Sequence, residues 1–171
     1  MKPTNKVVIM CLALLICFYM LWTQRAVTII MAGSQIEYDP HFVLKPFTSR
    51  DKRFETYGIV VNHFPLTEWG KIHWYLNHKK ELQKKYGIPS SRSYMITFWD
   101  IGSGFTDFKS SGNSDLYCFS RKNEPDKHCI EKHMFMEVNF DAGLYETFSF
   151  RNNDYYWITM SDGKLQRIKR A

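Results

Sequence analysis

Six histidines are the side chains in this sequence that are best suited to bind a metal ion. They are His41, His63, His73, His78, His128 and His133. His73 and His78 are five residues apart, so on a helix they would point about 140° away from each other and could not share an ion. The sequence contains no HExxH motif and no paired CxxC motifs, which zinc sites use. We therefore predict no metal site and no cofactor.

A serine between two glycines, Ser103, and three nearby aspartates could form a catalytic site. The serine lacks the flanking residues of the GxSxG nucleophile elbow, so this stretch is interpreted as a turn between strands. Asp100, Asp107 and Asp115 could act as acid and base, but their spacing matches no EF-hand loop and turns use carboxylates in the same way. We predict no catalytic or cofactor-binding residue, and an enzyme site assembled around these aspartates is the alternative.

An uncharged run from Val7 to Thr23, VVIMCLALLICFYMLWT, determines where the rest of the chain lies. At 1.5 Å per residue it covers about 25 Å, slightly less than the ~30 Å hydrocarbon core of a bilayer. A cleaved signal peptide begins in the same way, but the residues from Leu21 to Arg25 lack the small side chains that cleavage needs. We predict an uncleaved transmembrane anchor at residues 7–23, in contact with the lipid bilayer; cleavage is the alternative.

Positive charge is biased toward the amino-terminal side of this run. Lys2, Lys6 and the terminal amine precede it, whereas Arg25 alone follows it closely. By the positive-inside rule the amino end lies in the cytoplasm and the rest of the chain outside it. We predict two parts, a cytoplasmic tip with the anchor at residues 1–24 and one exported domain at residues 25–171.

The composition fits a folded domain that does not bind nucleic acid. Apolar residues make up 44% of the chain and aromatic residues 16%, which is enough to build a core. The formal net charge is +6, with acidic residues spread among the basic ones. A nucleic-acid partner would require a concentrated basic face, so none is predicted.

One helix and several strands would position any site. From Glu68 to about Tyr86 apolar residues recur at helical spacing, with Thr67 at the N-cap position and Gly87 after the end. Strands are predicted at residues 27–31, 56–62, 94–99, 116–120, 135–140, 145–150, 155–160 and 164–168. Residues 34–53 lack periodicity and are predicted to form a long loop. The predicted fold class is α+β: an N-terminal transmembrane helix, then a single mostly antiparallel sheet domain with one main amphipathic helix at about residues 67–86.

Three stretches of this sequence resemble a known protein family. They are NHFPLTEWGKIHWYL at residues 62–76, KKYGIP at 84–89 and ITFWDIGSGF at 96–105. The family is the enterobacterial membrane proteins called domain of unknown function 943. The resemblance also includes LYCF at 116–119 and CIEK at 129–132, whereas the loop at 34–53 is longer than expected for the family. It implies a Gram-negative inner-membrane setting and transfers no catalytic residue. Together with the apolar run and the charge bias, this setting predicts a single-pass protein of the bacterial inner membrane whose domain lies in the periplasm.

Cys118 and Cys129 are the two cysteines outside the apolar run. The periplasm is oxidising, so these thiols can pair there across a short segment that is rich in polar turn residues. We predict a disulfide between Cys118 and Cys129.

The absence of a catalytic signature favours a protein-binding module over an enzyme. Such a module could act as an immunity protein against an incoming toxin or as a scaffold for an envelope complex, with a protein partner whose identity the sequence does not give. Trp74 lies about 140° from Trp69 on the helix, away from the apolar stripe. We predict that Trp74, or the loop at 34–53, contacts the partner.

Overall fold

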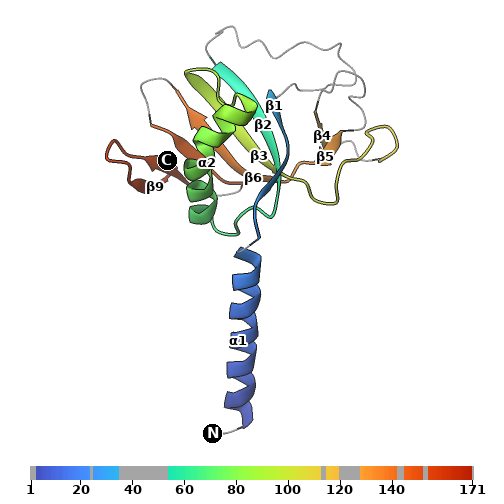
Figure 1. Cartoon of the computed structure of the whole chain (residues 1–171), viewed down its shortest axis with the longest axis vertical. Helices are drawn as coiled ribbons and strands as arrows, with labels where there is room; N and C mark the ends of the chain where they lie inside the picture. Colours follow the sequence, from blue (N-terminus) through green and yellow to red (C-terminus); the bar gives the residue numbers. More distant parts are fainter. Residues whose placement is uncertain are drawn as a thin grey trace.

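One helix, α1, extends from a layered domain in the computed structural model (Figure 1). The structure describes residues 3–23, 25–34, 54–112, 115–119, 128–141, 145–151 and 154–170. The predicted long loop therefore lies outside the described residues from position 35 to position 53. Residue 24, where we predicted the boundary between the two parts of the chain, also lies outside them.

The elements follow one another along the chain with two helices and nine strands in the described residues. They are α1 Pro3–Thr23, β1 Thr28–Ser34, β2 Phe54–Asn62, α2 Glu68–Tyr86, β3 Ser93–Asp100, β4 Leu116–Cys118, β5 Cys129–Glu131, β6 Met134–Phe140, β7 Thr147–Ser149, β8 Tyr155–Thr159 and β9 Leu165–Lys169. Seven strands form one sheet in the order β1-β2-β3-β6-β7-β8-β9, and β4 pairs with β5 in a second sheet. The β2 and β3 strands run parallel, and the other neighbours are antiparallel.

The predicted fold class is wrong on two points. In the part of the chain that the structure describes, no helix is long and apolar enough to cross a membrane. A span takes about 20 predominantly apolar residues, and the run from Val7 to Thr23 covers only about 25 Å. The large sheet is mixed, because β2 and β3 form a parallel pair near its centre that a mostly antiparallel description leaves out.

The parallel pair follows from the helix that connects its strands. Parallel neighbours need a long crossover, and α2 supplies it between β2 and β3. The helix has the predicted ends: the side chain of Thr67 accepts a hydrogen bond from the Gly70 backbone N–H at 3.0 Å, and Gly87 is left-handed with φ 69°. The predicted helix is thus confirmed as α2, which lies across one face of the large sheet (Figure 1).

The central strands are buried on both faces. The core beneath α2 includes Ile59, Val61, Phe98 and Phe148 from the sheet with Ile72 and Tyr75 from the helix. On the opposite face, Val60 and Trp99 pack against Tyr117, Phe119 and Ile130 of the β4–β5 layer. The two layers are closely fitted at Gly58, where an added Cβ would lie 2.9 Å from Cε1 of Phe119.

Candidate functional site

A groove of about 290 Å³ lies between α2 and the chain that enters β1. Its lining includes Trp74, His78, Glu81 and Lys85 from α2, with Val27 and Ile29 from the β1 side. These helical residues are separated by three or four positions, so they form one stripe along α2. The groove is therefore built where the helix faces the end strand of the large sheet.

Trp74 takes part in both the core and the groove. It is half-buried, and its ring meets that of Phe64 edge-on at 5.3 Å between centroids. The ring of His78 stacks on it at 4.5 Å, and Nδ1 of His78 lies 2.7 Å from the Trp74 carbonyl oxygen. The tryptophan predicted to contact a partner thus lines a groove with one side while the other packs against the domain.

The strand that borders the groove is at the edge of the sheet. β1 pairs with β2 on one side, and no other described strand pairs with it. The register shifts between Ile29 and Met31, which places a β-bulge at Ile30. A bulge limits uncontrolled pairing at an exposed edge. The residues before the bulge, from Val27 to Ile29, are the part of this edge that borders the groove.

A second polar cluster lies under α2 around Glu146. This carboxylate is 8% exposed, and its Oε1 accepts hydrogen bonds from the hydroxyls of Tyr75 and Tyr94, each at 2.7 Å. Lys79 Nζ is 3.0 Å from the same oxygen. The helix, the start of β3 and the segment before β7 are therefore joined at a single atom.

The environment of this cluster shifts the pKa values of its donors. Burial raises the pKa of Tyr75 and of Tyr94 above the ordinary value for a phenol, and the charge of Glu146 acts in the same direction. Burial alone would lower the pKa of Lys79, but its contacts with Tyr94 and Glu146 outweigh burial and raise it. Both phenols thus remain neutral donors and Lys79 remains a cation, so the cluster serves to fasten the layers together.

The raised phenol pKa values predict a loss of stability at alkaline pH. Their contribution is complete below the unfolded-state pKa of about 10 and is lost as pH rises above it, by about 1.4 kcal/mol per pH unit for each phenol. Urea unfolding of the wild type between pH 8 and pH 11 is expected to show this slope only above about pH 10. The loss of stability with pH should be less steep for the Tyr75→Phe variant. Equal slopes for the variant and the wild type would contradict a raised pKa at Tyr75.

The three aspartates singled out in the sequence are used in local contacts. Asp100 Oδ1 accepts from the Gly102 N–H at 3.2 Å, and Asp107 Oδ1 accepts from the Lys109 N–H at 2.8 Å. Asp115 is exposed and pairs with a lysine of the β5–β6 connection. In the described ranges, no group of three or more His, Cys, Asp or Glu residues could hold a metal ion.

The interpretation of the Gly-Ser-Gly stretch as a turn is confirmed. Gly102 and Gly104 have φ values of 53° and 109°, and the backbone N–H of Gly104 donates to the carbonyl of Ile101 at 2.9 Å. Glycine adopts this backbone conformation without a steric penalty. Ser103 is exposed at the tip of the turn, as expected of a connecting residue.

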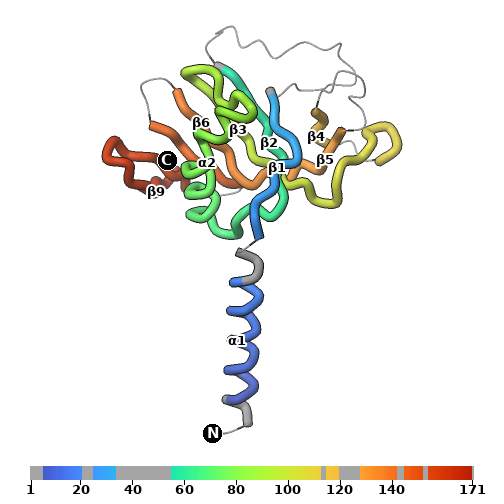
Figure 2. Tube along the Cα trace, viewed as in Figure 1, coloured from blue at the N-terminus to red at the C-terminus, as the bar shows by residue number. Residues whose placement is uncertain are grey.

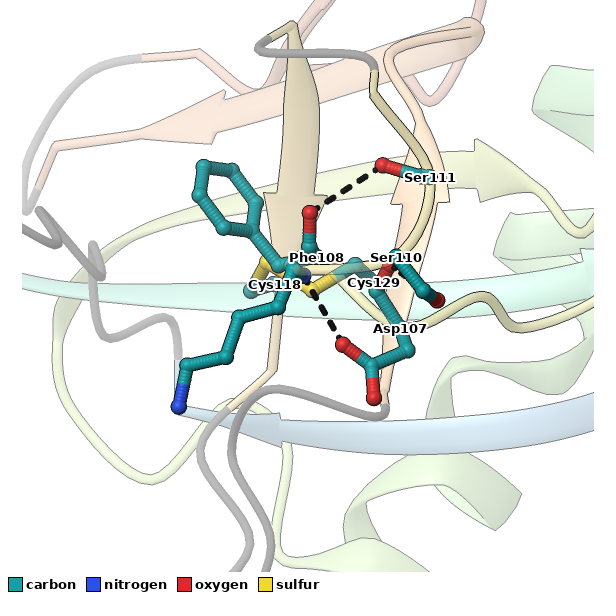
Figure 3. The surroundings of a disulfide bond; sticks show 7 residues. Asp107, Phe108, Ser110, Ser111, Cys118 and Cys129 are labelled. Atoms are coloured by element: carbon teal, nitrogen blue, oxygen red, sulfur yellow. Dashed lines mark hydrogen bonds between the residues drawn. A yellow bond between two sulfur atoms is a disulfide. The ribbon is translucent and has the colours of Figure 1, made fainter.

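The structure contains a disulfide between Cys118 and Cys129 (Figure 3). The two cysteines are direct partners across the β4–β5 pair, and both are buried. Figure 3 shows the adjacent turn that begins at Asp107, where the hydroxyl of Ser111 donates to the carbonyl of Phe108 at 3.2 Å. Most of the segment between the cysteines, residues 120–127, lies outside the described part of the chain.

Sequence reasoning missed the Glu146 cluster. The donors belong to positions 75, 79 and 94, so nothing near Glu146 in the sequence indicates that its side chain is buried. The available signal was indirect: Glu146 directly precedes a short strand, Thr147–Ser149, whose Phe148 is fully buried. The groove was not predicted from the sequence either, although Trp74, which lines it, was predicted to contact a partner.

Comparison with known proteins places the chain in a family. Neither the curated proteins nor the solved structures include a match. A family model described as "Enterobacterial putative membrane protein (DUF943)" matches residues 2–169, almost the whole chain. The chain therefore belongs to the enterobacterial membrane protein family DUF943.

Proposed function

We propose that this membrane protein is a binding module that holds an extended segment of a partner protein in the groove between α2 and β1. The observation that carries the proposal is the position of the groove beside β1, which is an edge strand among the described residues. An immunity protein and an envelope scaffold are two uses of such a surface.

The edge of β1 supplies main-chain recognition. An extended peptide can add to an exposed strand by backbone hydrogen bonding, and pockets for its alternate side chains then provide specificity. The bulge at Ile30 separates the segment that starts at Val27 from the remainder of β1. That segment lines the groove, so an added strand would place its side chains against α2.

The α2 side supplies side-chain recognition. Trp74 offers a rigid aromatic surface, and Glu81 and Lys85 are exposed charges of opposite sign one helical turn apart. The volume of about 290 Å³ is at the lower limit of small-molecule pockets, which begin at about 300 Å³. Such a space suits one or two peptide side chains better than a cofactor.

The proposal can be tested by site-specific photocrosslinking in intact cells. A photoreactive residue at Thr28 or at Glu81 should capture the same partner, because the two positions lie on opposite sides of one groove. Exchanging the charges, with Glu81→Lys and Lys85→Glu together, should reduce the adduct from Thr28 at least about tenfold. Lys80→Glu is the matched control, since Lys80 is exposed on α2 but does not line the groove.

Trp74→Ala is expected to reduce capture at Thr28 by at least about tenfold, or ~1.4 kcal/mol, because aromatic anchors dominate binding. Trp74 also packs against Phe64, so the amount of folded variant must be measured alongside the adduct. The charge exchange leaves the core untouched and separates the two effects. Unchanged capture in both variants would exclude the groove as the binding site.

We further propose that the domain lies in the periplasm. The buried disulfide supports this location, because disulfides persist in oxidising compartments. Alkaline phosphatase fused after Ala171 should be active in cells, and a cytoplasmic reporter at the same position should be inactive. The opposite pattern would refute the location. The cytoplasmic position of the amino end stays a prediction.

A further inference from the structure

We propose that the face of the domain formed by Leu66 and Trp69 rests on the surface of a phospholipid membrane. Leu66 is 55% exposed and Trp69 57% exposed, which is high for large apolar side chains on a folded domain. We call these two residues the Leu66–Trp69 patch. It is separate from the groove, so this inference does not depend on the proposed function.

The patch is held outward by the segment before α2. Phe64 is buried and stacks on Phe98 with 5.2 Å between ring centroids, so this loop is anchored to the core two residues before Leu66. Thr67 then caps the helix and fixes where Trp69 begins the first turn. Leu66 is therefore presented on a fixed backbone.

Trp69 is also held in an outward orientation. The ring of His73 stacks on it at 3.5 Å between centroids, and Nδ1 of His73 lies 2.9 Å from the Trp69 carbonyl oxygen. Just before Trp69, Glu68 accepts a hydrogen bond from Nε1 of Trp157 at 2.8 Å, which fastens this end of α2 to β8. The exposed indole thus stands on a rigid support.

The position of the patch identifies its occupant. The start of α2 and the loop before it lie at the end of the domain from which α1 extends (Figures 1 and 2). Arg25, just after α1, has Nη1 at 3.2 Å from Nε2 of His63 in that loop. The apolar side chains of α1 from Val7 to Met20 are exposed, so a membrane that contacts α1 lies on this side of the domain.

The chemistry of the patch suits a lipid surface better than a protein. Tryptophan and leucine beside cationic groups are the side chains that enter the boundary between headgroups and acyl chains. Arg25, which is exposed, would meet anionic headgroups. Two apolar side chains are also too few for a typical protein interface, which covers about 800 Å² on each partner.

Spin-label accessibility in the full chain tests the inference. Cys11 and Cys17 are replaced by alanine, and a nitroxide is attached in turn at Leu66→Cys, Trp69→Cys and Tyr145→Cys. Tyr145 is the control, because it is 48% exposed and far from the patch. It directly precedes Glu146, which accepts a hydrogen bond from Tyr94 at the start of β3, whereas Asp100 is at the other end of that strand. Each protein is reconstituted in vesicles of phosphatidylethanolamine and phosphatidylglycerol.

At each position the measured quantity is the ratio of accessibility to lipid-soluble oxygen over accessibility to a water-soluble nickel complex. This ratio should be at least about threefold higher at positions 66 and 69 than at position 145. The two labelled positions are exposed, so substitution there leaves the core intact. Nickel access at 66 and 69 equal to that at 145 would overturn the proposal. Protection from both reagents would overturn it as well, because it would indicate a protein contact in place of lipid.

Discussion

Replacing Glu146 with alanine should lower the free energy of unfolding by about 3 kcal/mol. Two buried tyrosine hydroxyls would lose their common acceptor, and each unsatisfied group costs about 1–2 kcal/mol. The loss of the Lys79 contact adds less, because that side chain is 37% exposed and water screens its charge. The measurement is urea unfolding of the purified full chain in detergent, followed by tryptophan fluorescence.

Two further variants make this prediction specific. Glu131→Ala removes an exposed carboxylate and should change stability by less than about 0.5 kcal/mol. The triple variant Glu146→Leu, Tyr75→Phe, Tyr94→Phe makes the three buried members of the network apolar and leaves only Lys79, which is 37% exposed, so much of the lost stability should return. If Glu146→Ala is no more destabilising than Glu131→Ala, the cluster does not fasten α2 to the sheet.

Replacing Cys118 and Cys129 with serine should lower the free energy of unfolding by about 3 kcal/mol, because the bond closes a loop between residues 11 positions apart. The loss of stability should mainly affect the β4–β5 layer, which covers Val60 and Trp99 of the large sheet. Urea unfolding of the serine variant against the wild type measures it.

Thiol counting gives an independent check of the disulfide. In a chain with alanine at positions 11 and 17, denatured protein should bind no alkylating reagent before reduction and two equivalents after it. Alkylation of both thiols without reduction would contradict the pairing and would remove the support for a periplasmic domain.

The local signals in the sequence predicted local structure well. Thr67 and Gly87 mark the two ends of α2, because capping depends on the side chain and backbone of the end residues themselves. The strand expected at 94–99 lies within β3 for a similar reason, since its residue types favour an extended backbone. The end of the first strand was predicted less well: we expected a strand at residues 27–31, but β1 continues to Ser34.

Features that depend on distant residues could not be predicted in the same way. The Glu146 site is assembled from three elements, and the groove forms only where α2 meets β1. The strand–helix–strand order could have predicted the parallel pairing of β2 with β3. The many short strands predicted after the helix favoured an antiparallel sheet instead. Asp100 and Asp107 looked like a site because they are close in sequence, whereas each bonds to its own turn.

The burial of β2 and β3 on both faces has a consequence for the newly made chain. Synthesis proceeds from the amino end, so β2, α2 and β3 exist before the β4–β5 layer has been made. During that interval Val60, Trp99 and the open surface at Gly58 face water. These surfaces are covered only when Phe119 and Ile130 pack over the sheet.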